Sequence, residues 1–202
     1  MNQVVKDDKQ SAEYFASNPD DIWIETVSGK HFYFESSQFD LDDGAHAIGM
    51  QCRYTGHCKK FYSVAEHSVL VSDLMLMFSL GDPFEGLMHD FHEGWFTDIA
   101  TPWKGLLPDY SVKEKQLEAR MRKQFGLPDK ITSGAKLADR LALYLEASEL
   151  IPSKGADWNF SEEVMELGRR FQEMQSCSAV VSYSPKEATM LFKGTYNEYR
   201  PN

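Results

Sequence analysis

The sequence predicts a mainly α-helical fold, a bundle of six or seven helices that follows one N-terminal β-hairpin. Apolar residues recur at helical spacing through most of the chain after residue 40. Residue types that commonly cap helices stand in front of several of these apolar runs. β-Branched and aromatic residues gather in one stretch only, near the N-terminus. A helical bundle is the fold class that accommodates all three observations.

Residues 22–34 carry the signal for the hairpin. Tryptophan, isoleucine, valine, phenylalanine and tyrosine are frequent in this stretch, and Ser28-Gly29-Lys30 divides it in two. A glycine-bearing turn between two β-prone runs is typical of a hairpin. We expect the polar residues 1–21 to form a flexible arm, and residues 22–202 to form a single domain.

Three helices are expected in the first half of the chain. Asp40 caps the first helix, which is expected over residues 41–52. The tetrapeptide Ser63-Val64-Ala65-Glu66 matches a capping box that opens the second helix. Asp82, which a proline follows, caps the third helix. We expect this third helix to continue as one apolar core helix through residues 86–98.

The sequence of the second half of the chain predicts further helices joined by short loops. The stretch 98–108, which contains two prolines, is expected to be a loop with one short helix. A second capping box, Ser184-Pro185-Lys186-Glu187, opens the last helix, which is expected to end near residue 199. The remaining helices are expected over residues 111–125, 132–150 and 161–175.

Charge and composition limit the possible partners. The chain carries 31 acidic against 21 basic residues, a formal net charge of −10. Nucleic-acid polymers and anionic membrane surfaces prefer a basic partner, so we expect neither to bind, whereas a small nucleotide is compatible with this charge. There is no apolar run of about 18 residues and no signal peptide. The three cysteines, Cys52, Cys58 and Cys177, form no CxxC pair, which favours reduced thiols and a cytoplasmic location.

His89-Asp90 and Glu93 stand out within the expected core helix. Ionisable groups are costly to bury among apolar residues unless they are paired or bind a metal. On one helix, residues three and four positions apart are neighbours, so one face can present an imidazole and two carboxylates to a common point. This pattern indicates a divalent-metal site with a spare carboxylate beside it. The alternative is a helix end with a few solvated charges.

His67 and Asp139 are candidates to complete such a site. His67 lies among core positions of the helix that Ser63 opens, and Asp139 is flanked by apolar residues on a later helix. Each has a plain structural alternative, a hydrogen-bonded core histidine for His67 and an ion pair with Arg140 for Asp139. The histidine–aspartate pair on the helix after His67 favours a shared metal.

In order and spacing, His67, His89-Asp90 and Asp139 resemble the H…HD…D signature of the HD-domain phosphohydrolases. These are helical, metal-dependent phosphatases and phosphodiesterases. The resemblance implies that these four side chains bind one divalent transition metal, and their imidazole and carboxylate groups suit zinc, cobalt, manganese or iron. It also implies that Glu93 is the general acid/base, and that Asp98 orients the attacking water or helps to bind a further metal.

The flanking sequence resembles a compact, often phage-encoded branch, related to bacterial 5′-deoxyribonucleotidases and to phage deoxyadenosine triphosphate triphosphohydrolases. The resemblance covers roughly residues 22–150. It implies that Arg53 and Lys104 contact phosphate, Arg53 in bidentate fashion, and that Tyr54 packs against the base or sugar. Gly56 departs from the adenine-selective members, which have a bulky aliphatic residue there, so we expect a more open base pocket.

The leading hypothesis is a metal-dependent phosphohydrolase of deoxyribonucleotides that serves nucleotide metabolism. It would remove phosphate from monophosphates or triphosphate from triphosphates. A phosphodiesterase that acts on a cyclic nucleotide or a dinucleotide is one alternative, and a metal-binding regulatory module without turnover is another. The resemblance further implies a homo-oligomer, and a location in the host cytoplasm if the protein is phage-encoded.

Overall fold

The computed structural model describes residues 22–175 and 178–201. The expected arm, residues 1–21, and Cys177 lie outside these described residues. The chain divides after Phe39 into two compact units, and each unit is described by itself. The expectation of a single domain over residues 22–202 therefore stays a prediction.

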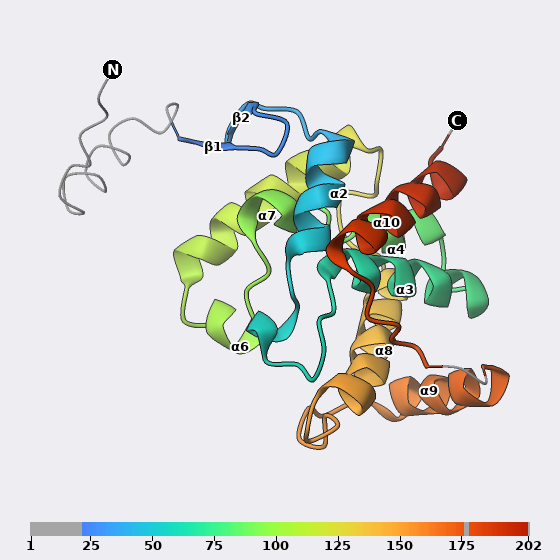
Figure 1. Ribbon diagram of the computed structural model, residues 1–202. Coiled ribbons are helices and arrows are strands. Elements are labelled where there is room, and N and C mark those ends of the chain that lie inside the picture. Colours follow the sequence, from blue (N-terminus) through green and yellow to red (C-terminus); the bar gives the residue numbers. More distant parts are fainter. Residues whose placement is uncertain (1–21, 176–177, 202) are drawn as a thin grey trace. The chain divides into compact units, whose positions relative to one another are not determined.

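The first unit contains the predicted hairpin (Figure 1). Strand β1 (Trp23–Glu25) pairs antiparallel with strand β2 (His31–Tyr33). The turn between them contains Gly29 at a φ of +77°, a conformation that favours glycine. The hairpin and its turn at Ser28-Gly29-Lys30 are confirmed.

The second unit is helical, as the sequence predicts. Six of its described helices have ten or more residues: α2 (Leu41–Met50), α3 (Val64–Met77), α7 (Pro108–Gln124), α8 (Ser133–Leu150), α9 (Glu162–Met174) and α10 (Pro185–Tyr199). The other described elements are short: η2 (Tyr54–Gly56), α4 (Pro83–Met88), α5 (Glu93–Phe96) and α6 (Thr101–Lys104). The mainly α-helical fold with one hairpin is confirmed, and the boundaries predicted for the long helices agree within three residues.

Helix α3 lies at the centre of the second unit. Nearly all of its residues up to Met75 are buried, and it packs against α2, α4, α8 and α10 (Figure 1). A helix covered on several sides needs apolar residues on several faces, which α3 has. Helices α8 and α9 extend this core, where Leu74, Leu141 and Phe171 belong to one buried cluster.

Side-chain caps set where several helices begin. Asp40, Ser63, Asp82 and Ser184 each accept a hydrogen bond from a backbone amide of the first helical turn. The full capping box forms at Ser184. At Ser63 only half of the predicted box forms, because the carboxylate of Glu66 is engaged elsewhere.

Glu66 ties the segment before α10 to α3. Its buried carboxylate accepts hydrogen bonds from the backbone amides of Val181 (3.2 Å), Ser182 (2.7 Å) and Tyr183 (3.1 Å). Burial raises the pKa of the Glu66 carboxyl, and these three donors act against that increase. The Glu66 side chain thus accepts hydrogen bonds from three backbone amides that have no partner within a helix or strand.

The core helix expected over residues 86–98 is interrupted, so this part of the prediction is wrong. Helix α4 ends at Met88, and tight turns follow, in which the Glu93 amide donates to the Asp90 carbonyl (3.0 Å). Helical structure resumes only for the single turn of α5. Because the chain turns after Met88, His89 and Asp90 follow the end of α4 instead of lying within a longer helix.

A buried ion pair joins α4, α7 and α8. Arg122 Nη2 donates to Glu85 Oε1 at 2.6 Å, and both side chains are almost fully buried. Glu85 also accepts hydrogen bonds from the amide (3.0 Å) and the hydroxyl (2.7 Å) of Thr132, the residue that caps α8. This arrangement fixes the start of α8, the helix that carries Asp139.

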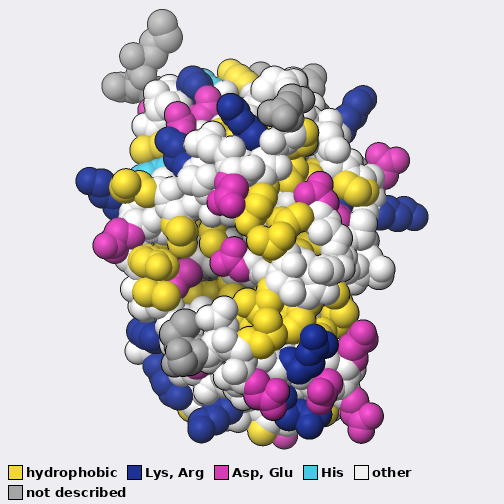
Figure 2. Space-filling view, turned by 90° about the vertical axis from the view of Figure 1, so that its right-hand side faces the viewer, with side chains coloured by type: hydrophobic (Ala, Val, Ile, Leu, Met, Phe, Trp, Pro, Cys, Tyr) yellow, Lys and Arg dark blue, Asp and Glu magenta, His cyan; other side chains and the backbone are white. Residues whose placement is uncertain are grey.

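No helix in the described ranges has the length and apolar character that crossing a bilayer requires. Figure 2 shows one face of the molecule, on which basic and acidic side chains are interspersed around several hydrophobic patches. Among the described residues of that face, the lysines and arginines form no continuous stripe.

Candidate metal site

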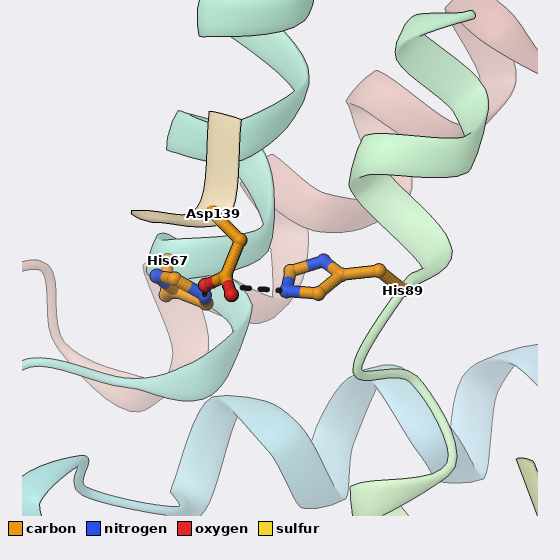
Figure 3. A group of neighbouring side chains, drawn as sticks. All are labelled: His67, His89 and Asp139. Atoms are coloured by element: carbon orange, nitrogen blue, oxygen red, sulfur yellow. Dashed lines mark ion pairs between the residues drawn. The ribbon is translucent and has the colours of Figure 1, made fainter. Parts of the chain in front are cut away.

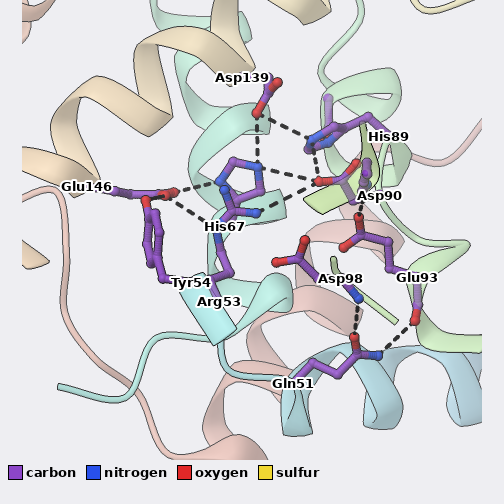
Figure 4. A network of polar contacts seen from close by, with 12 residues as sticks. Gln51, Arg53, Tyr54, His67, His89, Asp90, Glu93, Asp98, Asp139 and Glu146 are labelled. Atoms are coloured by element: carbon purple, nitrogen blue, oxygen red, sulfur yellow. Dashed lines mark hydrogen bonds and ion pairs between the residues drawn. The ribbon is translucent and has the colours of Figure 1, made fainter. Parts of the chain in front are cut away.

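The four residues predicted to bind a metal come together from three segments (Figures 3 and 4). His67 lies on α3, His89 and Asp90 follow α4, and Asp139 lies on α8. Asp139 Oδ1 is 3.2 Å from His67 Nε2 and 3.9 Å from His89 Nε2. Asp90 Oδ2 is 3.0 Å from His89 Nε2 and 3.6 Å from His67 Nε2. Both imidazoles therefore lie between the two carboxylates, and the ligand atoms of His67, His89 and Asp139 are all within 4.8 Å of one another.

Hydrogen bonds at Nδ1 direct the Nε2 atom of each imidazole towards these carboxylates. His67 Nδ1 donates to Glu146 Oε1 (2.6 Å), and His89 Nδ1 donates to the Gly86 carbonyl (2.7 Å). Both Nε2 atoms are buried, and the polar groups that they face within the described residues are the carboxylates of Asp90 and Asp139. Histidines that bind a metal through Nε2 commonly donate from Nδ1 in this way. The donor set fits a divalent metal ion, and His67, His89 and Asp139 could hold one.

Positively charged neighbours favour the ionised form of the Asp90 and Asp139 carboxylates. Burial raises the pKa of Asp90, but His89, His67 and Arg53 outweigh burial and hold that pKa well below its usual range. Burial likewise raises the pKa of Asp139, and the two histidines reverse the effect and lower it. Metal ligands must be deprotonated, so both carboxylates are ready to bind a cation.

Glu146 joins several of the predicted site residues, and sequence reasoning missed it. This α8 residue is fully buried. Besides His67, it accepts a hydrogen bond from Tyr54 Oη (2.6 Å) and lies 3.3 Å from Arg53 Nε (Figure 4). Burial raises the pKa of Glu146, but Arg53 and His67 lower it to about 2. A signal existed, because Glu146 follows Asp139 by seven residues, about two helical turns, and so shares its face.

Arg53 and Tyr54 belong to the same network. Arg53 is 9% exposed, and its Nη1 lies 4.0 Å from Asp90 Oδ2. The Tyr54 ring lies beside the Trp158 ring, with centroids 6.0 Å apart. Trp158 comes from the loop between α8 and α9, a second contribution that sequence reasoning missed. The phosphate and base contacts expected of Arg53 and Tyr54 stay predictions.

Gly56 lies at the exposed end of the loop that carries these two residues. Its φ is +78°, which favours glycine, and a Cβ placed there would meet nothing within 4 Å. The positive φ angle is therefore a second reason for a glycine at this position, separate from the expected open base pocket. The role of Gly56 in base selectivity stays a prediction.

Glu93 and Asp98 lie beside the cluster, and Gln51 holds their backbones together (Figure 4). Gln51 Nε2 donates to the Glu93 carbonyl (2.8 Å), and its Oε1 accepts from the Asp98 amide (2.9 Å). Glu93 is buried, and its Oε2 has no hydrogen-bond partner among the described residues. Burial, with Asp90 and Asp98, raises the pKa of Glu93 well above its usual value and outweighs the nearby cations.

Lys104 faces carboxylates. Its Nζ lies 2.7 Å from Glu114 Oε1 and 3.8 Å from Glu93 Oε1. His92, Glu93 and Glu114 form a second group that is close enough to hold a metal ion. Since the Lys104 ammonium already supplies a positive charge there, this group is a weaker candidate than the His67 cluster. The phosphate contact expected of Lys104 stays a prediction.

The fold and the cluster define a mainly α-helical protein with histidine and aspartate side chains that could hold a metal ion. The chain is 39% identical over 145 residues to YfdR, an uncharacterized protein of Escherichia coli K12, and the match covers 70% of this chain and 80% of YfdR. The chain therefore belongs to the family of YfdR. It is also 32% identical over 145 residues to an uncharacterized protein of Rhodobacter capsulatus, across 63% of this chain and 72% of that protein. No family model matches the chain.

Proposed function

We propose that this protein is a metal-dependent phosphohydrolase of deoxyribonucleotides, which removes phosphate from monophosphates or triphosphate from triphosphates. One observation carries the proposal: the buried Nε2 atoms of two histidines lie 3.0–3.9 Å from the carboxylates of Asp90 and Asp139, close to the buried carboxyl group of Glu93. Perturbed ionisable groups that converge in this way are typical of catalytic sites. The resemblance of the ligand order to the HD-domain signature adds support.

His67, His89, Asp90 and Asp139 are the residues that would hold the metal ion. Zinc, manganese, iron and cobalt all suit two imidazoles and two carboxylates. The ion supplies Lewis-acid activation of water and of a phosphoryl group. Because carboxylates raise the pKa of His67 to about 9 against the opposing effects of burial and Arg53, protons compete for this ligand at neutral pH.

Glu93 would transfer the proton. A carboxyl group whose pKa is raised above its usual value is a better proton acceptor than an ordinary glutamate, so it can take a proton from water and later give it to the leaving oxygen. The neighbouring carboxylate of Asp98 supports that role, because it helps to raise the pKa of Glu93. Gln51 forms hydrogen bonds with the Glu93 carbonyl and the Asp98 amide, so it would fix the positions of these two residues relative to each other.

Arg53, Lys104 and Tyr54 would bind the substrate. The Arg53 guanidinium lies within 4.0 Å of Asp90, so it brings positive charge close to the point where phosphate would bind. The Tyr54 ring, with Trp158 beside it, offers an aromatic surface to a base or a sugar. Lys104 lies near Glu93, where it would supply a second positive charge.

A phosphate-release screen tests the proposal. The purified protein is analysed for bound metal, loaded with zinc, manganese, iron or cobalt, and incubated with deoxyribonucleoside and ribonucleoside mono- and triphosphates and with a cyclic dinucleotide. We expect nucleoside from monophosphates, or nucleoside and tripolyphosphate from triphosphates. Hydrolysis of the cyclic dinucleotide alone would favour a phosphodiesterase, and metal binding without any product would favour a regulatory module.

Two aspartate variants tie the activity to the site. Asp90→Asn should lose bound metal and activity together, because one of two facing carboxylates is neutralised. Asp129→Asn is the matched control, since Asp129 is exposed and lies between α7 and α8. Full metal occupancy in Asp90→Asn would remove Asp90 from the proposed ligand set.

A further inference from the structure

Two thiols face each other at the base of the loop that carries Arg53 and Tyr54. Cys52 Sγ and Cys58 Sγ are 3.6 Å apart, and both side chains are partly exposed. A sulfur–sulfur bond requires about 2 Å. A rotation of the side chains with a small backbone shift would therefore bring the two sulfur atoms to bonding distance.

The loop between these cysteines is a tight turn that transmits such a shift to the site. The Gly56 amide donates to the Arg53 carbonyl (3.1 Å), and the Cys58 thiol lies 3.8 Å from the same carbonyl. Tyr54 and Thr55 have φ values of +57° and +54°, a region that residues with side chains seldom adopt. A strained turn has few alternative conformations, so closing its base must move the residues that it carries.

We propose that Cys52 and Cys58 are a redox modification site: they form a reversible disulfide, which lowers activity by displacing Arg53 and Tyr54 from Glu146. The effect on activity rests on the proposed function, whereas formation of the disulfide does not. Reversible disulfides of this kind respond to changes in the thiol–disulfide balance of the surroundings.

A small disulfide such as glutathione disulfide is the oxidant. The Cys52 thiolate attacks one of its sulfur atoms, which gives a mixed disulfide and releases one glutathione. Cys58 then loses its proton to solvent and attacks the Cys52 sulfur, which releases the second glutathione. Two protein thiols are oxidised, and glutathione disulfide is reduced to two molecules of glutathione. Burial and the neighbouring Cys52 raise the pKa of Cys58 to about 11, so oxidation should become faster as the pH increases.

The test uses the full chain with Cys177→Ser, which leaves Cys52 and Cys58 as its only cysteines. After incubation with glutathione disulfide we expect two thiols fewer and a mass lower by about 2 Da than in the reduced protein. Trypsin should then release residues 31–53 and 54–59 as one disulfide-linked species, because cleavage follows Lys30, Arg53 and Lys59. Two free thiols, or glutathione adducts without this link, would overturn the proposal.

Activity and a matched control test the consequence. The linked protein should lose phosphohydrolase activity by about tenfold or more, since a shift of about 1 Å at a site can have effects of this size. Dithiothreitol should restore it. The variant with both Cys52→Ser and Cys58→Ser in the same background should keep its activity after the same incubation, and equal loss there would overturn the proposal. Unchanged activity in the linked protein would also overturn it, while a reduced protein without activity would count against the proposed function alone.

Discussion

One buried carboxylate, Glu146, orients side chains with different tasks in the site. It accepts hydrogen bonds from His67 and Tyr54 and lies beside Arg53. Since an imidazole ring is held by the partner of its second nitrogen, Glu146 sets the direction in which His67 presents Nε2. It is a positioning residue, because it does not face the point where the ligands converge.

Glu146→Gln should reduce metal affinity by about 10–100-fold, the usual effect of losing a partner that orients a metal-binding histidine. An amide can still accept one hydrogen bond, so the fold should survive. The measurement is a competition titration with a metal chelator. Glu163→Gln, on the exposed face of α9, is the control. Equal affinities in the two variants would show that Glu146 has a structural role only.

Glu93→Gln should keep the bound metal while kcat falls by about 10²–10⁴-fold, the usual contribution of general acid–base catalysis. Glutamine matches glutamate in size, and Glu93 does not belong to the His67 cluster, so metal binding should not change. Steady-state kinetics and metal analysis of the same preparation check both parts. A kcat near that of the original protein would exclude Glu93 from proton transfer.

The Glu93 carboxyl should also titrate at an unusually high pH in the metal-free protein. Burial, Asp90 and Asp98 all raise its pKa, so it should keep its proton at pH values where an exposed glutamate, with a pKa of about 4.3, has lost it. Infrared spectroscopy across this range should show a protonated-carboxyl band. The band should be absent from Glu93→Gln, and its presence there would assign it to another group.

Sequence reasoning found the residues whose chemistry is unusual for their surroundings. His67, His89-Asp90 and Asp139 stand out because polar side chains interrupt apolar helical patterns, and the structure brings them together. It missed Glu146 and Gln51, whose partners lie 79 and 42 residues away along the chain. Local patterns do not encode which distant backbone or side chain such a residue will contact.

At the scale of elements, a close crossing positions α5 against α2. A Cβ on Gly94 of α5 would lie 3.2 Å from the carbonyl oxygen and 3.3 Å from the Cα of Gly44 on α2. These distances are tighter than most contacts of a Cβ atom, so a side chain at residue 94 would require Gly44 to move by a few tenths of an ångström. The crossing matters for the site, because Gln51 follows α2 and bonds to Glu93 at the start of α5.

Gly94→Ala should destabilise the protein by about 1–3 kcal/mol, because the backbone of Gly44 must shift by a few tenths of an ångström to accommodate the methyl group. Denaturant unfolding measures this change. Gly194→Ala, at an exposed and unobstructed position within α10, should instead stabilise by about 0.5–1 kcal/mol, as expected for alanine in a helix. Similar effects of both substitutions would contradict the close crossing.

Helix starts were predictable and one helix end was not. Capping residues such as Asp40 and Asp82 act on their own first turn, so their effect can be identified from local sequence. The end of α4 at Met88 has no such marker, since neither glycine nor proline follows directly. The apolar pattern continues past Met88 because the turns that follow are also buried. Such a pattern reports burial, and it does not distinguish a helix from a buried turn.

At the scale of the whole second unit, stability should depend on the charge of Glu85. Burial raises the pKa of this carboxyl, but hydrogen bonds from Thr132 and Arg122 outweigh burial and lower it. A group with a lowered pKa in the folded state stabilises the protein above its unfolded pKa, about 4.3 for glutamate. This contribution is lost as the pH falls through the lower, folded value.

Glu85→Gln should therefore lower the free energy of unfolding by about 3–5 kcal/mol at neutral pH, because the buried Arg122 charge loses its partner. The difference from the original protein should shrink as the pH falls below about 4. Unfolding curves at several pH values check both statements. Glu173→Gln, at an exposed position of α9, should change neither, and a constant difference across pH would contradict the assignment to Glu85.

The three amides that Glu66 binds have a consequence for hydrogen exchange. Val181, Ser182 and Tyr183 lie outside any helix or strand, where amide protons ordinarily exchange rapidly with deuterium. Their hydrogen bonds to one buried carboxylate should protect them about as well as amides within α3. The segment leads directly into α10, so slow exchange at these positions would report that α10 stays packed on α3. The measurement requires neither substrate nor metal.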